Sequence, residues 1–290
     1  MRVLGGLVLL FFVIAAMFAA CTEATLVGRF IHLTDTHLLR AYGKGTDPKK
    51  NCIAGKSTGD AGEFGDYNCD TVWAVRNFTE ETLKHRQKPD FILYTGDHTA
   101  LKDPNQSIAD TEWYINDVAN LLREVRAAYG PEVRVFPMLG NHDSFPFYQF
   151  PEKGPFYVYE AAAAAWKDFL QPESLETVRI GGYYTELIEP GLRLVVVNTA
   201  MYFDGNWVIP QWRVDPGGQF AWLRGVLQKA KDAGELVFIA AHIPPGATLS
   251  VCIVLFLFVC SFVMVSCCCP LVSNMNSWNL TCGMNSTIST

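Results

Sequence analysis

Short apolar runs alternate with amphipathic segments through the middle of this chain. The runs have the length of buried strands, and they lie at 29–33, 91–94, 133–136, 183–188, 192–197 and 236–240. The amphipathic segments place apolar residues at helical spacing, and they lie at 70–86, 110–129, 161–170 and 219–233. Strands that alternate with helices are typical of α/β domains in which much of the sheet is parallel. The pattern therefore predicts an α/β fold.

Polar clusters directly follow four of these predicted strands. They are Asp35-Thr36-His37, Gly96-Asp97, Gly140-Asn141-His142-Asp143 and His242. Taken alone, each has an ordinary explanation as a capping pair, a turn or a buried histidine. In α/β sheets, however, ligands collect outside the carboxyl ends of the strands. Because Asp, His and Asn supply the oxygen and nitrogen donors of two-metal hydrolytic sites, the clusters together predict a metal site.

The N-terminus has the layout of a secretory signal peptide. Arg2 precedes an apolar run from Val3 to Ala20, and a short exit of Cys, Thr, Glu and Ala follows. We predict a signal peptide over residues 1–24, with cleavage after Ala20 or after Ala24. An uncleaved membrane anchor is the alternative. The protein is therefore expected to be secreted or lysosomal.

Glycosylation signals and cysteines fit this secretory route. Asn77-Phe78-Thr79 and Asn105-Gln106-Ser107 are N-glycosylation acceptor sequences in polar surroundings. Cys52 and Cys69 bracket a Gly- and Asp-rich loop, and an oxidising compartment would let them form a disulfide. The net charge of −6 is mild, and no basic stripe suggests a nucleic-acid partner.

Residues 249–290 differ in composition from the rest of the chain. No Asp, Glu, Lys or Arg follows Glu235, and an apolar run from Val251 to Val265 leads to Cys267-Cys268-Cys269. The segment 249–269 approaches the roughly 20 residues that cross a bilayer, so it is a candidate membrane anchor, although no basic residue flanks it. We favour the alternative that a retained intron or a shifted reading frame encodes the tail. The predicted division of the chain is therefore a signal peptide at 1–24, a folded domain at 26–248 and a tail at 249–290.

In its motifs the chain resembles the calcineurin-like metallophosphoesterases, and within them the acid sphingomyelinase-like phosphodiesterases. The likeness covers residues 29–246. It includes the polar clusters and three further stretches, which are Gly65-Asp66-Tyr67-Asn68-Cys69-Asp70, Asn198-Thr199 and Asp215-Pro216-Gly217-Gly218-Gln219-Phe220-Ala221-Trp222-Leu223. The resemblance implies a four-layer α-β-β-α sandwich. It also implies metal-dependent hydrolysis of small phosphodiesters, such as nucleotide derivatives or phospholipid head groups, with a phosphomonoesterase as the enzymatic alternative.

The resemblance also implies a role for each residue of the polar clusters. Asp35 and His37 would hold the first metal ion, Asn141 and His242 the second, and Asp97 would bridge both. Two ions about 3.5–4 Å apart would activate a hydroxide between them and clamp the phosphate oxygens. Zinc suits the mixed Asp, His and Asn ligands, and iron and manganese stay open.

His142 and Asp143 would act beside the metal ions. By the same resemblance, His142 would protonate or stabilise the leaving oxygen, and Asp143 would orient His142. Two aromatic segments, 145–159 and 198–203, are candidate substrate walls. Aromatic packing beneath a loop is the ordinary alternative for both segments.

The chain departs from the family pattern in two places. The family has a histidine four residues after the bridging aspartate, where this chain has Leu101, and His98 is the candidate replacement. The family also closes its site with a late Gly-His-x-His motif, whereas no histidine follows His242 here. Each ion is left with three candidate protein ligands, so we predict weak metal binding, an incomplete second sheet and an exposed sheet edge. A catalytically silent variant, misfolded or tethered to a membrane, is the alternative function.

Overall fold

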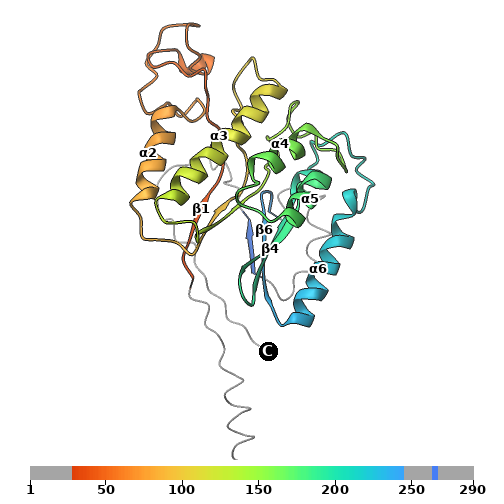
Figure 1. Cartoon of the computed structure of the whole chain (residues 1–290). Helices are drawn as coiled ribbons and strands as arrows, with labels where there is room; N and C mark the ends of the chain where they lie inside the picture. The colour runs from red at the N-terminus through yellow and green to blue at the C-terminus, as the bar shows by residue number, and fades with distance from the viewer. Residues whose placement is uncertain (1–27, 245–262, 267–290) are drawn as a thin grey trace, which may run out of the picture.

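Two β-sheets lie next to each other in the computed structural model, with helices around them (Figure 1). The structure describes residues 28–244 and 263–266. The first sheet is parallel and ordered β1-β2-β3, with strands β1 (Phe30–Leu33), β2 (Phe91–Tyr94) and β3 (Arg134–Pro137). The second is ordered β4-β5-β6-β7, with strands β4 (Tyr184–Glu189), β5 (Leu192–Val197), β6 (Leu236–Ala241) and β7 (Val263–Ser266). Only β4 runs antiparallel to its neighbour, so the predicted α/β class is confirmed.

Five α-helices surround these sheets in the described residues. They are α2 (Trp73–Lys84), α3 (Ile108–Ala127), α4 (Tyr157–Ala165), α5 (Pro172–Gly181) and α6 (Gln219–Ala233). Short 3-10 helices lie at η1 (Pro48–Lys50), η2 (Thr199–Tyr202) and η3 (Pro216–Gly218). Apolar residues of α3 and α4 join the large core that contains β2 and β3, whereas α6 packs on β5 and β6.

The strand β5 buries both of its faces, which fits its almost continuous run of apolar residues. Val195 packs with Leu223 of α6, whereas the next residue, Val196, joins the large core. The ring of Phe238 on β6 lies 5.9 Å from the ring of Phe30 on β1. Side chains of the two sheets therefore meet in one apolar core, and this packing brings the ends of β1 and β6 together.

The helix α6 agrees with its predicted range, while the ends of α3 and α4 differ by two to five residues. Gly234, with a φ of 68°, ends α6 in the left-handed conformation that glycine adopts without strain. The helix α5 was not predicted. Its start and stop signals, Pro172 and Gly182, are present, but only Leu175 and Val178 give it a buried apolar side.

The start of α2 differs from its prediction because Asp70 has another partner. The predicted helix begins at Asp70, whereas α2 begins at Trp73 without a side-chain cap. Oδ2 of Asp70 accepts hydrogen bonds from the main-chain N–H groups of Leu101 and Lys102, each at 2.7 Å. The Asp70 carboxylate therefore binds the loop after β2 and does not cap the start of α2.

Part of the tail joins the second sheet. Val263–Ser266 forms β7, which pairs in parallel with β6 and places Ser266 beside Ala241. The strand β6 is therefore not an edge of the second sheet, whereas β4 and β7 are its outer strands in the described residues. The predicted signal peptide at 1–24 and the rest of the tail, including most of the candidate anchor at 249–269, lie outside the described residues. Within the described residues, no helix has both the length and the apolar character to span a membrane.

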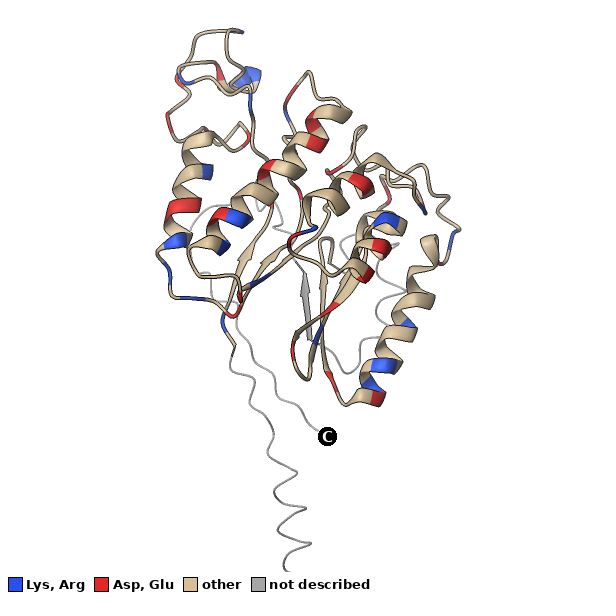
Figure 2. Ribbon diagram, viewed as in Figure 1, with Lys and Arg blue, Asp and Glu red and all other residues tan. Residues whose placement is uncertain are grey.

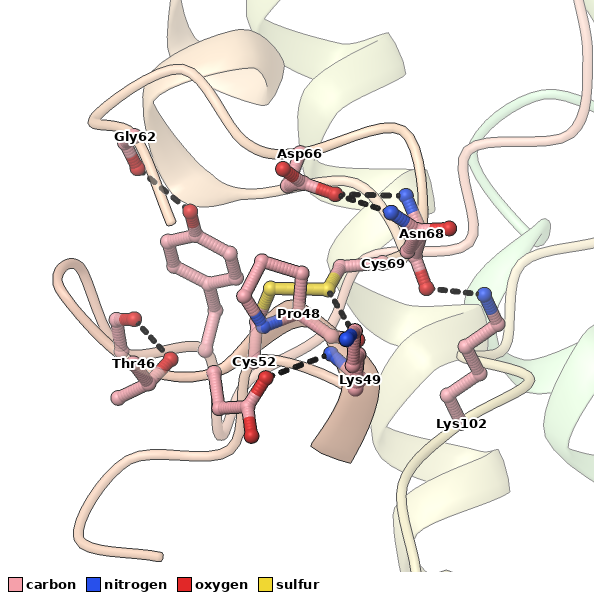
Figure 3. Close-up of a disulfide and its surroundings, with 12 residues drawn as sticks. Thr46, Pro48, Lys49, Cys52, Gly62, Asp66, Asn68, Cys69 and Lys102 are labelled. Atoms are coloured by element: carbon pink, nitrogen blue, oxygen red, sulfur yellow. Dashed lines mark hydrogen bonds between the residues drawn. A yellow bond between two sulfur atoms is a disulfide. The ribbon is translucent and has the colours of Figure 1, made fainter. Parts of the chain in front are cut away.

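The predicted disulfide is present and lies within the segment 43–70, where it joins Cys52 to Cys69 (Figure 3). We call this segment the disulfide loop. Cys52 and Cys69 are joined, and the hydroxyl of Tyr42 donates a hydrogen bond to the carbonyl of Gly62 inside the loop. Lys102 Nζ donates to the carbonyl of Asn68, which ties the loop to the segment after β2. One covalent bond and a set of main-chain hydrogen bonds within the segment therefore hold the loop.

Charged residues lie on the outer helices, and the two glycosylation acceptors lie on α2 (Asn77) and in the loop before α3 (Asn105). Acidic and basic side chains are interspersed along α2 and α3, whereas α6 is mostly basic (Figure 2). Neighbouring opposite charges form ion pairs there, as in the Arg76–Glu80 pair of α2. Asn77 and Asn105 are both exposed, so a glycan could be attached at either position.

Candidate metal centre

The carboxyl ends of β1, β2, β3 and β6 meet at one edge of the two sheets, and the loops that follow them carry the polar side chains. We call Asp35, His37, Asp97, Asn141 and His242 the ligand cluster. One ligand atom from each of Asp35, Asp97 and His242 lies within 4.8 Å of the other two. Residues that are far apart in the chain are therefore brought together as the strand-end pattern predicts.

Asp97 occupies the middle of the ligand cluster. Its Oδ2 lies 3.3 Å from His37 Nε2, and its Oδ1 lies 3.4 Å from His242 Nε2. His37 Nε2 is also 3.6 Å from Asp35 Oδ1, and His242 Nε2 is 2.8 Å from Asn141 Oδ1. The side chain of Asp97 is 3% exposed, so this carboxylate faces protein groups on both sides. Its two oxygens thus point to two separate groups of ligands.

The two histidines of the ligand cluster both turn Nε2 toward these carboxylates. His37 Nδ1 lies 2.7 Å from the carbonyl oxygen of Thr99, and His242 Nδ1 lies 2.7 Å from that of Thr95. Because a carbonyl can only accept a hydrogen bond, each Nδ1 carries the hydrogen. This arrangement leaves Nε2 as the atom that can bind a metal ion, and it is the usual orientation of metal-binding histidines.

The charges of the cluster favour a bound cation. Burial alone would lower the pKa of His37, but its contacts with Asp35 and Asp97 raise it to about 11. Burial also opposes the charge on His242, and Asp97 nevertheless raises the pKa of His242 to about 9. Burial would raise the pKa of Asp97, yet His242 and His37 hold it well below its usual range. The donors therefore fit divalent cations, which would replace the protons on the two imidazoles.

The ligand loops have unusual backbone geometry. Asp35, His37 and Asp97 all have positive φ angles, of 53°, 37° and 61°. Non-glycine residues rarely adopt this left-handed conformation, and such strain gathers at functional sites. A Cβ atom on Gly140 would lie 2.1 Å from Asp97 Oδ1, so the loop after β3 needs glycine to approach Asp97. Close packing between loops thus sets the direction of the ligands.

His142 lies beside the ligand cluster and against aromatic side chains. Its Nε2 is 4.0 Å from Asp97 Oδ2, and its ring centroid is 5.6 Å from that of His37. The rings of Phe147 and Tyr148 contact it at 5.2 and 4.8 Å. Burial lowers the pKa of His142 below its usual value. A neutral imidazole is therefore favoured near pH 7 at this position.

Asp143 has a different partner from the one that the resemblance implies. Its carboxylate accepts hydrogen bonds from the main-chain N–H groups of Gly140, Asp97 and His98, and from the imidazole of His98. No hydrogen bond joins its side chain to His142 in the described structure. Neighbouring residues of this tight loop direct their side chains apart, so Asp143 turns away from the metal side. Contrary to the expectation, the side chain that Asp143 contacts is His98 and not His142.

His98 does not replace the histidine that is absent at Leu101. It is fully buried, its Nδ1 contacts Asp143 Oδ2 at 2.6 Å, and its ring lies 4.8 Å from that of Tyr94. These contacts lie behind the ligand cluster. The carbonyls of Thr95 and Thr99, which orient the two ligand histidines, were not predicted. Main-chain oxygens leave no residue-type signal in a sequence.

The chain is similar in sequence to one protein family and to several of its phosphodiesterases. Residues 28–258 match the family model for calcineurin-like phosphoesterases. The chain is 39% identical over 228 residues to sphingomyelinase phosphodiesterase C of Dictyostelium discoideum. It is 38% and 33% identical, over 227 residues each, to acid sphingomyelinase-like phosphodiesterase 3b and cyclic GMP-AMP phosphodiesterase SMPDL3A of Homo sapiens. These alignments cover 76% of this chain but only 49%, 48% and 49% of the relatives, so the chain spans about half their length.

Proposed function

The chain belongs to the calcineurin-like phosphoesterase family, and we propose that it is a metal-dependent phosphodiesterase acting on small phosphodiesters. Asp97 supports this most directly, because its two oxygens lie 3.3 and 3.4 Å from two different imidazole nitrogens. A carboxylate placed between two groups of ligands could bind one metal ion with each of its oxygens. The similarity to three phosphodiesterases supports the choice of reaction.

Each part of the ligand cluster has a role in this proposal. Asp35 and His37 would hold one ion, Asn141 and His242 would hold the other, and Asp97 would contact both. Two divalent ions, when bound, stabilise charge on phosphoryl oxygens and make water a better nucleophile. Mixed oxygen and imidazole donors favour zinc, and iron or manganese would fit the same donors. The resemblance to a four-layer α-β-β-α sandwich is supported by the positions of α3 and α6 on the outer faces.

His142 is the proposed general acid. It lies beside the ligand cluster, and because burial lowers its pKa, the protonated form that donates to a leaving oxygen is populated mainly below neutral pH. Tyr148 and Phe203, whose ring centroids are 5.0 Å apart, continue the aromatic surface from His142. Such rings would pack on a nucleobase or on the apolar part of a lipid head group. Two of the reported relatives are named as a sphingomyelinase and as a cyclic GMP-AMP phosphodiesterase, so their names cover both kinds of substrate.

The reaction can be tested with two simple esters. The full chain, stripped with a chelator and given zinc or manganese, should hydrolyse bis(4-nitrophenyl) phosphate faster than 4-nitrophenyl phosphate. Asp97→Asn should remove this activity, and Asp204→Asn, which changes an exposed acidic residue, should keep it. A preference for the monoester would favour the phosphomonoesterase instead. Two bound ions without hydrolysis of either ester would favour the catalytically silent variant.

We also propose that the protein follows the secretory route, to the cell exterior or to lysosomes. The disulfide between Cys52 and Cys69 supports an oxidising compartment, and the exposed positions of Asn77 and Asn105 suit glycosylation. Membrane association through the tail remains a prediction. Glycosidase treatment of the protein collected from the medium of expressing cells should reduce its apparent mass. Retention of an unglycosylated protein in the cytosol would contradict this route.

A further inference from the structure

A buried polar pair lies behind the ligand cluster and is not part of it. The side chains of His98 and Asp143 are both fully buried, and His98 Nδ1 lies 2.6 Å from Asp143 Oδ2. A buried carboxylate destabilises the folded state unless hydrogen bonds compensate for lost water. Here the carboxylate accepts hydrogen bonds on both oxygens, so it is well compensated.

The Asp143 carboxylate joins the two loops that carry the central ligands. Its Oδ2 accepts the N–H of Asp97 at 3.0 Å and the N–H of Gly140 at 2.7 Å. Asp97 is the shared carboxylate of the ligand cluster, and Gly140 directly precedes the ligand Asn141. Because Asp97 is buried, its main-chain N–H needs a hydrogen-bond partner within the protein. One oxygen therefore determines the relative position of both loops.

His98 determines how that oxygen is directed. The imidazole N–H of His98 donates a hydrogen bond to Oδ2 of Asp143. The main-chain N–H of His98 donates to Oδ1 of Asp143 at 2.6 Å. The carboxylate plane is thus defined by donors from one residue. The imidazole ring cannot turn freely, because the rings of Tyr94 and Trp166 lie 4.8 and 6.5 Å from it. These contacts keep Nδ1 aimed at Asp143.

We propose that His98 is a positioning residue for the metal centre, which it serves by orienting Asp143 toward the loops of Asp97 and Asn141. The inference rests on the proposed metal centre and adds a residue that does not itself touch the ions. Groups that support metal ligands in this way usually change metal affinity by about 10–100-fold when they are removed. A residue with a merely structural role would instead change stability and leave the affinity unaltered.

Two substitutions of similar size separate these roles. His98→Asn keeps an N–H donor near the position of Nδ1, whereas His98→Leu removes the donor and leaves a similar volume. Zinc is titrated by calorimetry into the chelator-stripped full chain, and the unfolding midpoint is measured in chelator. We expect His98→Leu to weaken zinc binding about 10–100-fold and His98→Asn to restore it to within about threefold of wild type. Val118→Ala, in the buried side of α3, controls for loss of stability at a core position outside the loops that carry the ligands.

Equal weakening by both substitutions, or unchanged zinc binding in His98→Leu, would overturn the role of His98. If His98→Leu does not fold, Asp143→Asn takes its place, since it weakens the same contacts from the other side. Zinc affinity of Asp143→Asn within about threefold of wild type would then overturn the inference. A wild-type chain that binds no zinc would overturn the metal centre itself, which distinguishes that failure from a failure of His98 alone.

Discussion

The ligand cluster and the disulfide loop both hold polar segments in place, but they do so by different means. In the ligand cluster, the buried Asp97 faces two imidazoles. Main-chain hydrogen bonds join the loops after β1 and β2, and the carboxylates of Asp97 and Asp143 join the loop after β3 to the loop after β2. In the disulfide loop, many residues are exposed, including Phe64 and Tyr67, and a covalent bond closes the segment. Electrostatic contacts are strong where water is excluded, whereas an exposed loop gains little from them. Burial therefore determines which kind of restraint can work.

Removing the shared charge should have the largest effect on the ligand cluster. Asp97→Asn takes away the carboxylate that both histidines face, so zinc affinity should fall more than about 100-fold, beyond the effect of losing a supporting group. Calorimetric titration of the stripped chain measures this loss. Asp204→Asn serves as the exposed control. The disulfide should still form in both variants, which thiol counting checks. A loss of less than tenfold would mean that Asp97 is not a shared ligand.

Opening the disulfide should have the next largest effect, and it should fall on stability alone. The two cysteines are separated by 17 positions, and closure of a loop of about this length contributes about 3 kcal/mol to the free energy of unfolding. The double variant Cys52→Ser, Cys69→Ser should lose this amount in urea unfolding, because its unfolded chain is less restricted. Its zinc affinity should match that of wild type. A loss of affinity as large as that of Asp97→Asn would show that the two regions form one unit.

A methyl group at Gly140 should strain the ligand cluster. The added Cβ would lie 2.1 Å from Asp97 Oδ1, so the loop must shift, and the free energy of unfolding should fall by about 1–3 kcal/mol. Gly225→Ala is the matched control. Gly225 lies inside α6 with open space around it, so alanine should stabilise that helix by about 1 kcal/mol. Equal effects of both substitutions would contradict the close approach of the two loops.

The smallest effect is expected at the hydrogen bond that joins Tyr42 to the disulfide loop. The Tyr42 hydroxyl donates to the carbonyl of Gly62, and Tyr42→Phe should cost about 0.5–1.5 kcal/mol of unfolding free energy. Tyr67→Phe, at a residue that is 93% exposed, should change nothing measurable. Urea unfolding of both variants provides the comparison. If Tyr42→Phe were as harmful as loss of the disulfide, polar contacts rather than the covalent bond would hold this loop.

Strong local patterns made several elements predictable. The apolar runs before Asp35, Asp97 and His242 are strands, and the polar residues after them meet at one sheet edge because parallel strands end together. The helix α6 was predictable from its apolar spacing and from Gly234 at its end. By contrast, α5 has weak amphipathic spacing, and the pairing of β7 with β6 depends on contacts that local composition does not report.

The partners of His98 and Asp143 needed the tertiary structure. In the sequence, Asp143 adjoins His142, and His98 adjoins Asp97, so both seemed to belong to the reacting groups. The left-handed backbone at Asp97 changes the direction of this loop, and burial then pairs His98 with Asp143 instead. Neither the φ angle nor the burial of a polar residue follows from neighbouring residue types alone.

The sequence by itself determined the α/β class, the cysteine pair and the strand ends that carry donor side chains, because these depend on local periodicity and residue chemistry. Only the tertiary structure decided which histidine nitrogens face the carboxylates and which aspartate supports them. His242 and Asn141, whose side chains lie 2.8 Å apart, are separated by 101 positions in the chain. Contact at such separation is set by how the two sheets pack, and it depends on the whole core rather than on any one segment.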